Sequence, residues 1–269
     1  MGRKNCAGVF LAAFVCFLPA RPRAEETRSQ GELDSLFQFH IASSDVWRGE
    51  VLNDALCLQP SFYLFSEKLS FELWGTTNLE GRSGENRGSR INAMLGHMHH
   101  GNEHLFNSGV IAHYFPNRSG HRENTAEIFL GYGLDIRLLP SVVAYYDFVD
   151  VNGLYVAASL RRIFPLIEDE LHLHLQMQTG WADATYAEQK FSLPRDSPEE
   201  ERAFVPNGSA FIDTTLALSM PIRLNEKTRF TPSVKYMRLM DKDLRSAFRD
   251  AGADADKLSF SIGLEIDFF

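Results

Sequence analysis

Along most of the chain, apolar residues occupy every second position and polar residues stand between them. This spacing is typical of β-strands that have two unlike faces. The clearest segment is 171–178, where leucines and a methionine alternate with histidines and glutamines: Leu171, His172, Leu173, His174, Leu175, Gln176, Met177 and Gln178. The last segment repeats the pattern with six apolar positions from Leu258 to Phe268. Six apolar positions in strict alternation are enough for this last segment to cross a membrane as a strand.

Reading the whole chain in this way gives twelve strands and an all-β fold. The predicted strands are 35–45, 55–65, 69–79, 90–98, 105–115, 124–135, 138–148, 153–163, 169–181, 210–222, 228–239 and 257–269. The even number and the two-faced pattern favour a single antiparallel transmembrane β-barrel over 35–269.

The connections between these strands fall into two alternating classes. Every second connection is short, and these lie at 66–68, 99–104, 136–137, 164–168 and 223–227. The long ones all belong to the other class: 80–89, 182–209 and 240–256. Outer-membrane barrels have short periplasmic turns and longer outer loops, which places both termini in the periplasm. A soluble β-sandwich also alternates, but it does not require two classes of loop.

The N-terminal segment has the order of a secretory signal. Arg3 and Lys4 precede the apolar run 7–20, which is shorter than the roughly 20 residues that a spanning helix needs. We therefore expect 1–24 to be a signal peptide that is removed, and 25–34 to be a short periplasmic segment. No later stretch of 18 apolar residues occurs, so membrane spans must be strands. The expected location is the outer membrane of a Gram-negative bacterium.

The charge excludes one class of partner. Cleavage after Ala24 removes four of the 27 basic residues, which leaves 23 against 35 acidic residues and a net charge of −12. Such a chain has no basic footprint for nucleic acid. Cys57 is then the single cysteine and cannot form an internal disulfide. No motif indicates a cofactor.

Four motifs spread over the chain resemble one family. They are SSDVWRG at 43–49 followed by LQP at 58–60, NTAEIFLG at 124–131, AYYD at 144–147 with Tyr155, and FTPSV at 230–234. Together they resemble the TorF family of porin-like outer-membrane proteins. The resemblance implies a barrel with a porin-like role, and it carries over no substrate and no catalytic residue.

The carboxyl end resembles the aromatic terminus that the barrel-assembly machinery recognises. Phe268 and Phe269 are therefore interpreted as an assembly signal, with that machinery as a partner during biogenesis and outer-membrane lipid as a partner afterwards. One detail departs from the resemblance. The apolar face of the last strand runs through even numbers, so Phe269 has the opposite parity.

Ionisable residues recur on the inferred inner face and are candidates for lining a pore. With two histidines they are Glu72, Glu127, Asp147, Arg161, His172, His174, Asp213, Arg229, Lys235 and Glu265, and Asp267 shares their face. Opposed charges can orient a solute in a channel, or they can pair and fill a closed barrel. His172 and His174 are interpreted as part of a polar wall. Twelve strands predict a narrow lumen, because small barrels are filled by side chains.

Arg48 lies in the motif where the first strand meets its outer loop. Trp47 at the membrane interface and Arg48 at the head groups would explain the motif without a ligand. The second interpretation is that Arg48 bends inward as a pore-mouth residue. Two further segments can plug the lumen if they fold inward. They are the loop 182–209 and a short amphipathic helix within 241–254, where Leu244, Ala247, Phe248 and Ala251 have helical spacing.

Neither a metal centre nor a catalytic site is expected. The cluster His97, His99, His100 and His104 has Glu103 as its only close carboxylate and fits a solvated rim better than a zinc or copper site. No Gly-x-Ser-x-Gly motif accompanies the serines and histidines.

The sequence thus predicts a narrow passive channel for small polar solutes, not an enzyme. A non-conducting structural or interaction barrel is the first alternative, and a lipid-modifying outer-membrane enzyme is the second. The oligomeric state and the identity of the solute stay open.

Overall fold

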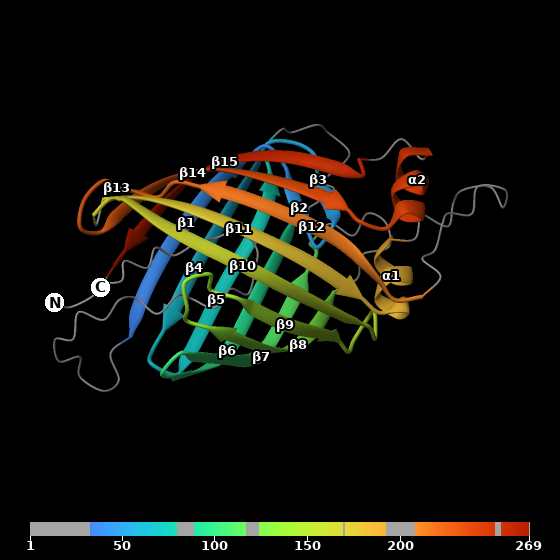
Figure 1. The fold of residues 1–269 in the computed structure, drawn as a ribbon, viewed down its shortest axis with the longest axis horizontal. Coiled ribbons are helices and arrows are strands. Elements are labelled where there is room, and N and C mark those ends of the chain that lie inside the picture. Colours follow the sequence, from blue (N-terminus) through green and yellow to red (C-terminus); the bar gives the residue numbers. More distant parts are fainter. Residues whose placement is uncertain are drawn as a thin grey trace.

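The computed structural model describes residues 33–79, 89–116, 124–168, 170–191, 208–250 and 254–268. Twelve antiparallel strands of these residues form a closed barrel (Figure 1). They are β1 Asp34–Ala42, β4 Cys57–Phe65, β5 Leu69–Asn78, β6 Arg90–Gly101, β7 His104–Tyr114, β8 Thr125–Leu134, β9 Ser141–Asp147, β10 Leu154–Ile167, β11 Leu171–Ala182, β12 Ala210–Ser219, β14 Thr228–Leu239 and β15 Asp256–Asp267. Neighbours follow chain order, and pairing of β1 with β15 closes the ring. The predicted barrel is confirmed.

The expected strand 210–222 is interrupted. β12 ends at Ser219, and the two-residue strand β13 Ile222–Arg223 resumes between the same neighbours, β11 and β14. Pro221 explains the break, because proline has no backbone N–H to donate to a neighbouring strand. Prediction of one continuous strand here was wrong. The pairs β12–β14 and β13–β14 nevertheless form one side of the same wall.

The two ends of the barrel differ as the connections predicted. The turn end carries the short connections, among them 66–68 and 135–140. The loop end carries the hairpin of β2 Asp45–Trp47 and β3 Glu50–Asn53, together with helices α1 Ala184–Phe191 and α2 Lys242–Asp250 (Figure 1). Helix α2 confirms the helix expected within 241–254, whereas α1 was not predicted. No helix in the described ranges has the length and hydropathy to cross a membrane.

Several boundaries differ from the prediction by a few residues. Strand β1 begins at Asp34, inside the expected periplasmic segment, and ends at Ala42, so Asp45 belongs to the hairpin. Strand β6 extends to Gly101 and β10 to Ile167, which shortens the turns that follow them. The expected signal peptide 1–24 and Phe269 lie outside the described residues.

The outer face of the barrel is apolar over the middle of its strands. Large apolar side chains stand exposed there, among them Leu73, Leu95, Val110, Ile128, Leu130, Leu160, Met177, Leu216, Phe260 and Ile262. Cross-strand pairs such as Met177 with Leu216 make the apolar surface continuous between strands. Because a closed barrel also satisfies its backbone hydrogen bonds between strands, this surface is suited to lipid.

Candidate functional site

The side chains expected to line a pore all lie on the inner face of the barrel. Eight are buried, and two, Arg229 and Lys235, are half-buried; the buried ones are Glu72, Glu127, Asp147, Arg161, His172, His174, Asp213 and Glu265. Several have local partners. Thr125 donates to Asp147 at 2.7 Å, and Arg229 forms an ion pair with Glu265 on the neighbouring strand. The inner face is therefore polar, and part of its charge is neutralised within the wall.

The β2–β3 hairpin folds into the barrel instead of standing outside it. Its turn consists of Arg48 and Gly49, which have φ angles of 47° and 82°. Two positive φ values define the tight type I′ turn that joins hairpin strands. A Cβ on Gly49 would lie 3.0 Å from the Cβ of Asp213 and 3.2 Å from Leu239. The turn thus touches the wall formed by β12 and β14.

Residues 44–46 tie the base of this hairpin to further walls. Ser44 shares a hydroxyl hydrogen bond with Ser259 of β15. Asp45 accepts hydrogen bonds from Gln59 of β4 at 3.1 Å and from Arg90 of β6 at 3.3 Å. Lys235 of β14 donates to the carbonyl of Val46 at 3.3 Å. The hairpin therefore crosses the lumen at the loop end.

Arg48 connects the hairpin to the remaining wall, β8 to β10. Its two terminal nitrogens donate to the two carboxylate oxygens of Glu127 at 2.7 and 2.8 Å. Its Cζ lies 4.0 Å from the ring centroid of Tyr145 and 4.9 Å from that of Tyr155. One guanidinium nitrogen also donates to the hydroxyl of Tyr186 in α1 at 3.2 Å. This combines a bidentate ion pair with cation–π contacts.

Arg48 stays charged although it is only 6% exposed. Burial disfavours the charged guanidinium, but the carboxylate of Glu127 outweighs this and raises the pKa of Arg48 above its ordinary value. Burial also raises the pKa of the Tyr186 phenol, which therefore remains neutral and can accept the hydrogen bond from Arg48. A buried ion pair of this kind is costly to break, because the remaining partner is left charged and buried.

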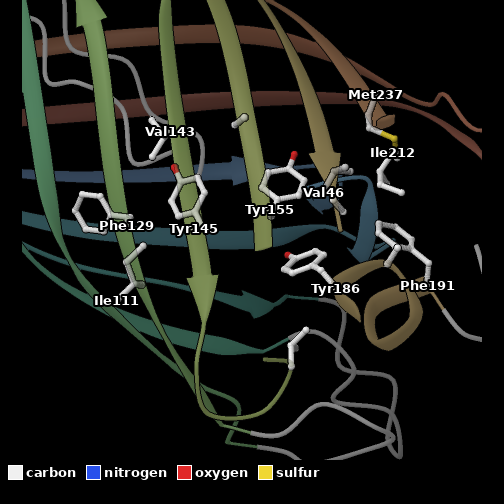
Figure 2. Close-up of a cluster of buried hydrophobic side chains, with 14 of the residues drawn as sticks. Val46, Ile111, Phe129, Val143, Tyr145, Tyr155, Tyr186, Phe191, Ile212 and Met237 are labelled. Carbon is white, nitrogen blue, oxygen red and sulfur yellow. The ribbon is translucent and has the colours of Figure 1, made fainter. Parts of the chain in front are cut away.

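Aromatic side chains from the wall and from α1 pack around this ion pair. Figure 2 shows the rings of Tyr145, Tyr155 and Tyr186 lying near one another inside the barrel. The ring centroids of Tyr155 and Tyr186 are 5.4 Å apart, and those of Tyr145 and Tyr155 are 6.3 Å apart. The Tyr155 hydroxyl donates to Asp213 at 2.9 Å, which fixes the ring. Together these aromatic contacts hold α1 against the inner wall of the barrel.

Helix α1 sits close to the wall because of a glycine. A Cβ on Gly153 would lie 2.6 Å from the backbone nitrogen of Tyr186, so any side chain there would push the helix away. Asp183 accepts a hydrogen bond from the backbone of Tyr186 at 2.7 Å and caps the helix start. Phe191 at the helix end contacts Phe248 of α2, with ring centroids 6.4 Å apart. The two helices thus pack against each other at the loop end, where Tyr186 of α1 contacts Arg48 of the hairpin.

A small cavity remains beside the ion pair. Its lining includes Trp47, Arg48, His113, Glu127 and Tyr186. The interface interpretation of Trp47 and Arg48 is therefore wrong: Trp47 packs against the interior and has its ring 4.4 Å from the Cζ of Arg90. The physical reason is that the hairpin turns into the barrel, where the wall offers Arg48 a carboxylate and aromatic faces. Arg48 and Glu127 lie in two of the four motifs that resemble the TorF family. That shared resemblance was the one signal in the sequence that linked the two residues.

The other predicted positions lie away from this site. His99 and His100 end β6 and His104 begins β7, where His104 shares a 2.8 Å hydrogen bond with Tyr132. The described residues contain no group of three or more histidines, cysteines or carboxylates that could hold a metal ion. His172 and His174 pack edge to face on β11. Phe268 is exposed, and its backbone nitrogen donates to Ser35 of β1.

A closed antiparallel barrel with an apolar outer belt and a polar, ionisable inner face defines the class. It is that of membrane-spanning β-barrels of the outer-membrane type, in which lipid covers the outer face and the inner face is polar.

Solved structures of this class are similar to the chain in fold. The KdgM porin has 7% identity and a TM-score of 0.49 over 88% of this chain and 100% of its own. The NanC porin has 10% identity and a TM-score of 0.47 over 87% and 99%. An outer membrane channel from Pseudomonas putida F1 has 10% identity and a TM-score of 0.47 over 92% and 99%. No protein-family model and no curated protein matches the sequence.

Proposed function

We propose that this protein is a narrow passive channel for small polar solutes in the outer membrane of a Gram-negative bacterium. The observation that carries the proposal is a set of buried polar atoms on the inner face that have no hydrogen-bond partner in the described chain. They include Gln38 Oε1, Ser61 Oγ, Gln178 Nε2 and Ser219 Oγ. Buried polar atoms need partners, and ordered water inside the barrel would supply them. A wetted lumen is the first requirement of a channel.

Charge and size set the class of solute. The inner face carries both signs, with Lys235 and Arg161 as well as Glu72 and Glu265. Mixed charge favours small polar solutes over one strongly charged class. A barrel of twelve strands with a hairpin inside it leaves little room, so the proposed solutes are small. The same proposal has three further parts. The protein belongs to the TorF family, it is assembled by the barrel-assembly machinery, and it resides in outer-membrane lipid.

Planar-bilayer recording tests the channel directly. The mature chain is refolded, and heat-modifiable migration on a gel establishes that the barrel has formed. Small discrete current steps in simple salt are the expected result. A folded protein that never conducts, with or without its hairpin, contradicts the proposal.

A non-conducting structural or interaction barrel is the second candidate. The hairpin that crosses the lumen favours it, since Ser44, Asp45, Val46 and Arg48 contact β4, β6, β8, β14 and β15. The two candidates differ in one respect. In a channel the hairpin leaves the lumen at times, whereas in a structural barrel the hairpin stays in the lumen permanently.

A further inference from the structure

Four residues around Arg48 form a site whose side chains all come from outside the hairpin. Glu127 comes from β8, Tyr145 from β9, Tyr155 from β10 and Tyr186 from α1. The carboxylate supplies two acceptor oxygens, and two rings offer their faces within 5 Å of one point, the Cζ of Arg48. We define these four residues as the cation cage. A carboxylate with aromatic faces around it is the chemistry that recognises organic cations.

The geometry of the cage selects a planar cation that has more than one N–H donor. Glu127 accepts two parallel hydrogen bonds, and the Tyr186 hydroxyl accepts a third at 3.2 Å. A guanidinium group matches this fork and stacks on tyrosine faces, whereas an ammonium group presents a point charge. Asp213 adds a second carboxylate behind Tyr155. His113 faces Glu127 from β7 at 3.4 Å, and Arg90 lies beyond Trp47.

Arg48 occupies the cage in an unfavourable backbone conformation. Its φ of 47° lies in the left-handed region, which residues with a Cβ adopt at an energetic cost. The type I′ turn of the hairpin requires this conformation, and the cage holds the side chain that the turn presents to it. Arg48 thus resembles a tethered ligand that the hairpin delivers to a wall site.

We propose that the cation cage is a binding site for small guanidinium-bearing solutes, and that Arg48 of the hairpin fills it in the present structure. A solute of this class competes with Arg48 for Glu127. Since Arg48 is one of the contacts that hold the hairpin across the lumen, occupation of the cage by a free cation removes that contact and loosens the hairpin. This last consequence rests on the proposed channel, but binding to the cage does not.

Chemical rescue of Arg48→Ala tests the site. The probe is the guanidinium ion at 20 mM, compared with sodium at equal ionic strength, and the readout is the thermal unfolding midpoint of the refolded protein in detergent. Guanidinium is expected to raise the midpoint of Arg48→Ala by about 3 °C, as for millimolar affinity. The wild type, whose cage is filled, is expected to show no rise.

The double variant Arg48→Ala/Glu127→Gln is the matched control, because its cage has lost the carboxylate. It is expected to respond equally to guanidinium and sodium. An equal response of Arg48→Ala to the two ions overturns the proposal, and so does a guanidinium response that survives in the double variant. If Arg48→Ala refolds poorly, guanidinium added during refolding is expected to restore the folded yield. Failure of that rescue also overturns it.

Bilayer currents separate this proposal from the channel. In Arg48→Ala, free guanidinium is expected to bind the cage, but it is not attached to the hairpin and does not hold the hairpin in the lumen. The thermal rise is therefore expected whether or not the barrel conducts. A thermal rise without conductance in any variant retains the cage and rejects the channel. Conductance without a specific thermal rise retains the channel and rejects the cage.

Discussion

Arg48 and Glu127 stand 79 positions apart in the chain and form two parallel hydrogen bonds at 2.7 and 2.8 Å inside the barrel. One belongs to the turn of an inner hairpin and the other to a wall strand. The pair therefore fastens the hairpin turn to β8, in addition to the contacts that Asp45 and Val46 make with other strands. Its strength is a property of both residues together, which a double-mutant cycle can measure.

Arg48→Ala and Glu127→Gln are each expected to lower the free energy of unfolding by about 3–5 kcal/mol, because each leaves a buried partner without its counterpart. The double variant is expected to lose less than the sum, with a coupling of about 1–3 kcal/mol. Urea unfolding in detergent measures all three. Arg137→Ala removes an exposed arginine from a turn and serves as control, with a change of about 0.5 kcal/mol or less. Additive losses would show that the pair does not act as a unit.

Gly153→Ala is expected to displace α1 from the loop end. The added Cβ would lie 2.6 Å from the Tyr186 backbone, so the helix must move. Trypsin cleavage after Lys190 in α1 should therefore accelerate several-fold, as followed by mass spectrometry. Gly101→Ala is the matched control, since a Cβ there meets nothing within 4 Å. Equal cleavage rates in the two variants would argue against close packing of α1 on the wall.

Leu130→Arg tests whether the outer belt faces lipid. Leu130 is 65% exposed in the middle of β8, where an arginine at the bilayer midplane costs about 2–4 kcal/mol. Leu138→Arg lies in a turn at the barrel rim, where the expected cost is about 0–1 kcal/mol. Both are measured by urea unfolding from lipid vesicles. A soluble protein would tolerate both changes equally, since both positions are exposed.

Cysteine labelling tests whether water wets the lumen. In a Cys57→Ala background, Ser219→Cys places a thiol on the inner face and Leu218→Cys places one on the outer face. In vesicles, a small charged thiosulfonate is expected to modify the inner thiol at least ten times faster, because lipid shields the outer one. Intact-protein mass reports the modification. The reverse order would contradict the assignment of the two faces.

Most of the barrel could be predicted because alternation is a local property of the sequence. Leu173 and His174 point to opposite faces whatever their neighbours are, so strand number and facing follow directly from the chain. Pro221, which interrupts the tenth barrel strand, is also a local signal. The alternating pattern over 210–222 continues across it, so the pattern alone predicted one continuous strand. Helix α2 was visible for the same reason, since Leu244 and Phe248 have helical spacing.

The inward hairpin could not be predicted, because its partners are distant in sequence. Arg48 is adjacent to Trp47 and Gly49, which suit an exposed turn equally well, and Glu127 acquires its meaning only once β8 faces the lumen. Helix α1 was missed for a related reason. Its buried residues, Tyr186, Ala187 and Phe191, are selected by the wall they contact and not by a strong helical period.

The most direct test of a narrow channel is the single-channel current of two refolded proteins in planar bilayers. One is the wild type, and the other has residues 45–53 replaced by two glycines, which is feasible because Ala42 and Cys57 are paired neighbours. Small, infrequent steps are expected from the wild type, and larger, sustained steps from the shortened variant. If the shortened variant folds and inserts but carries no current, the barrel is not a channel.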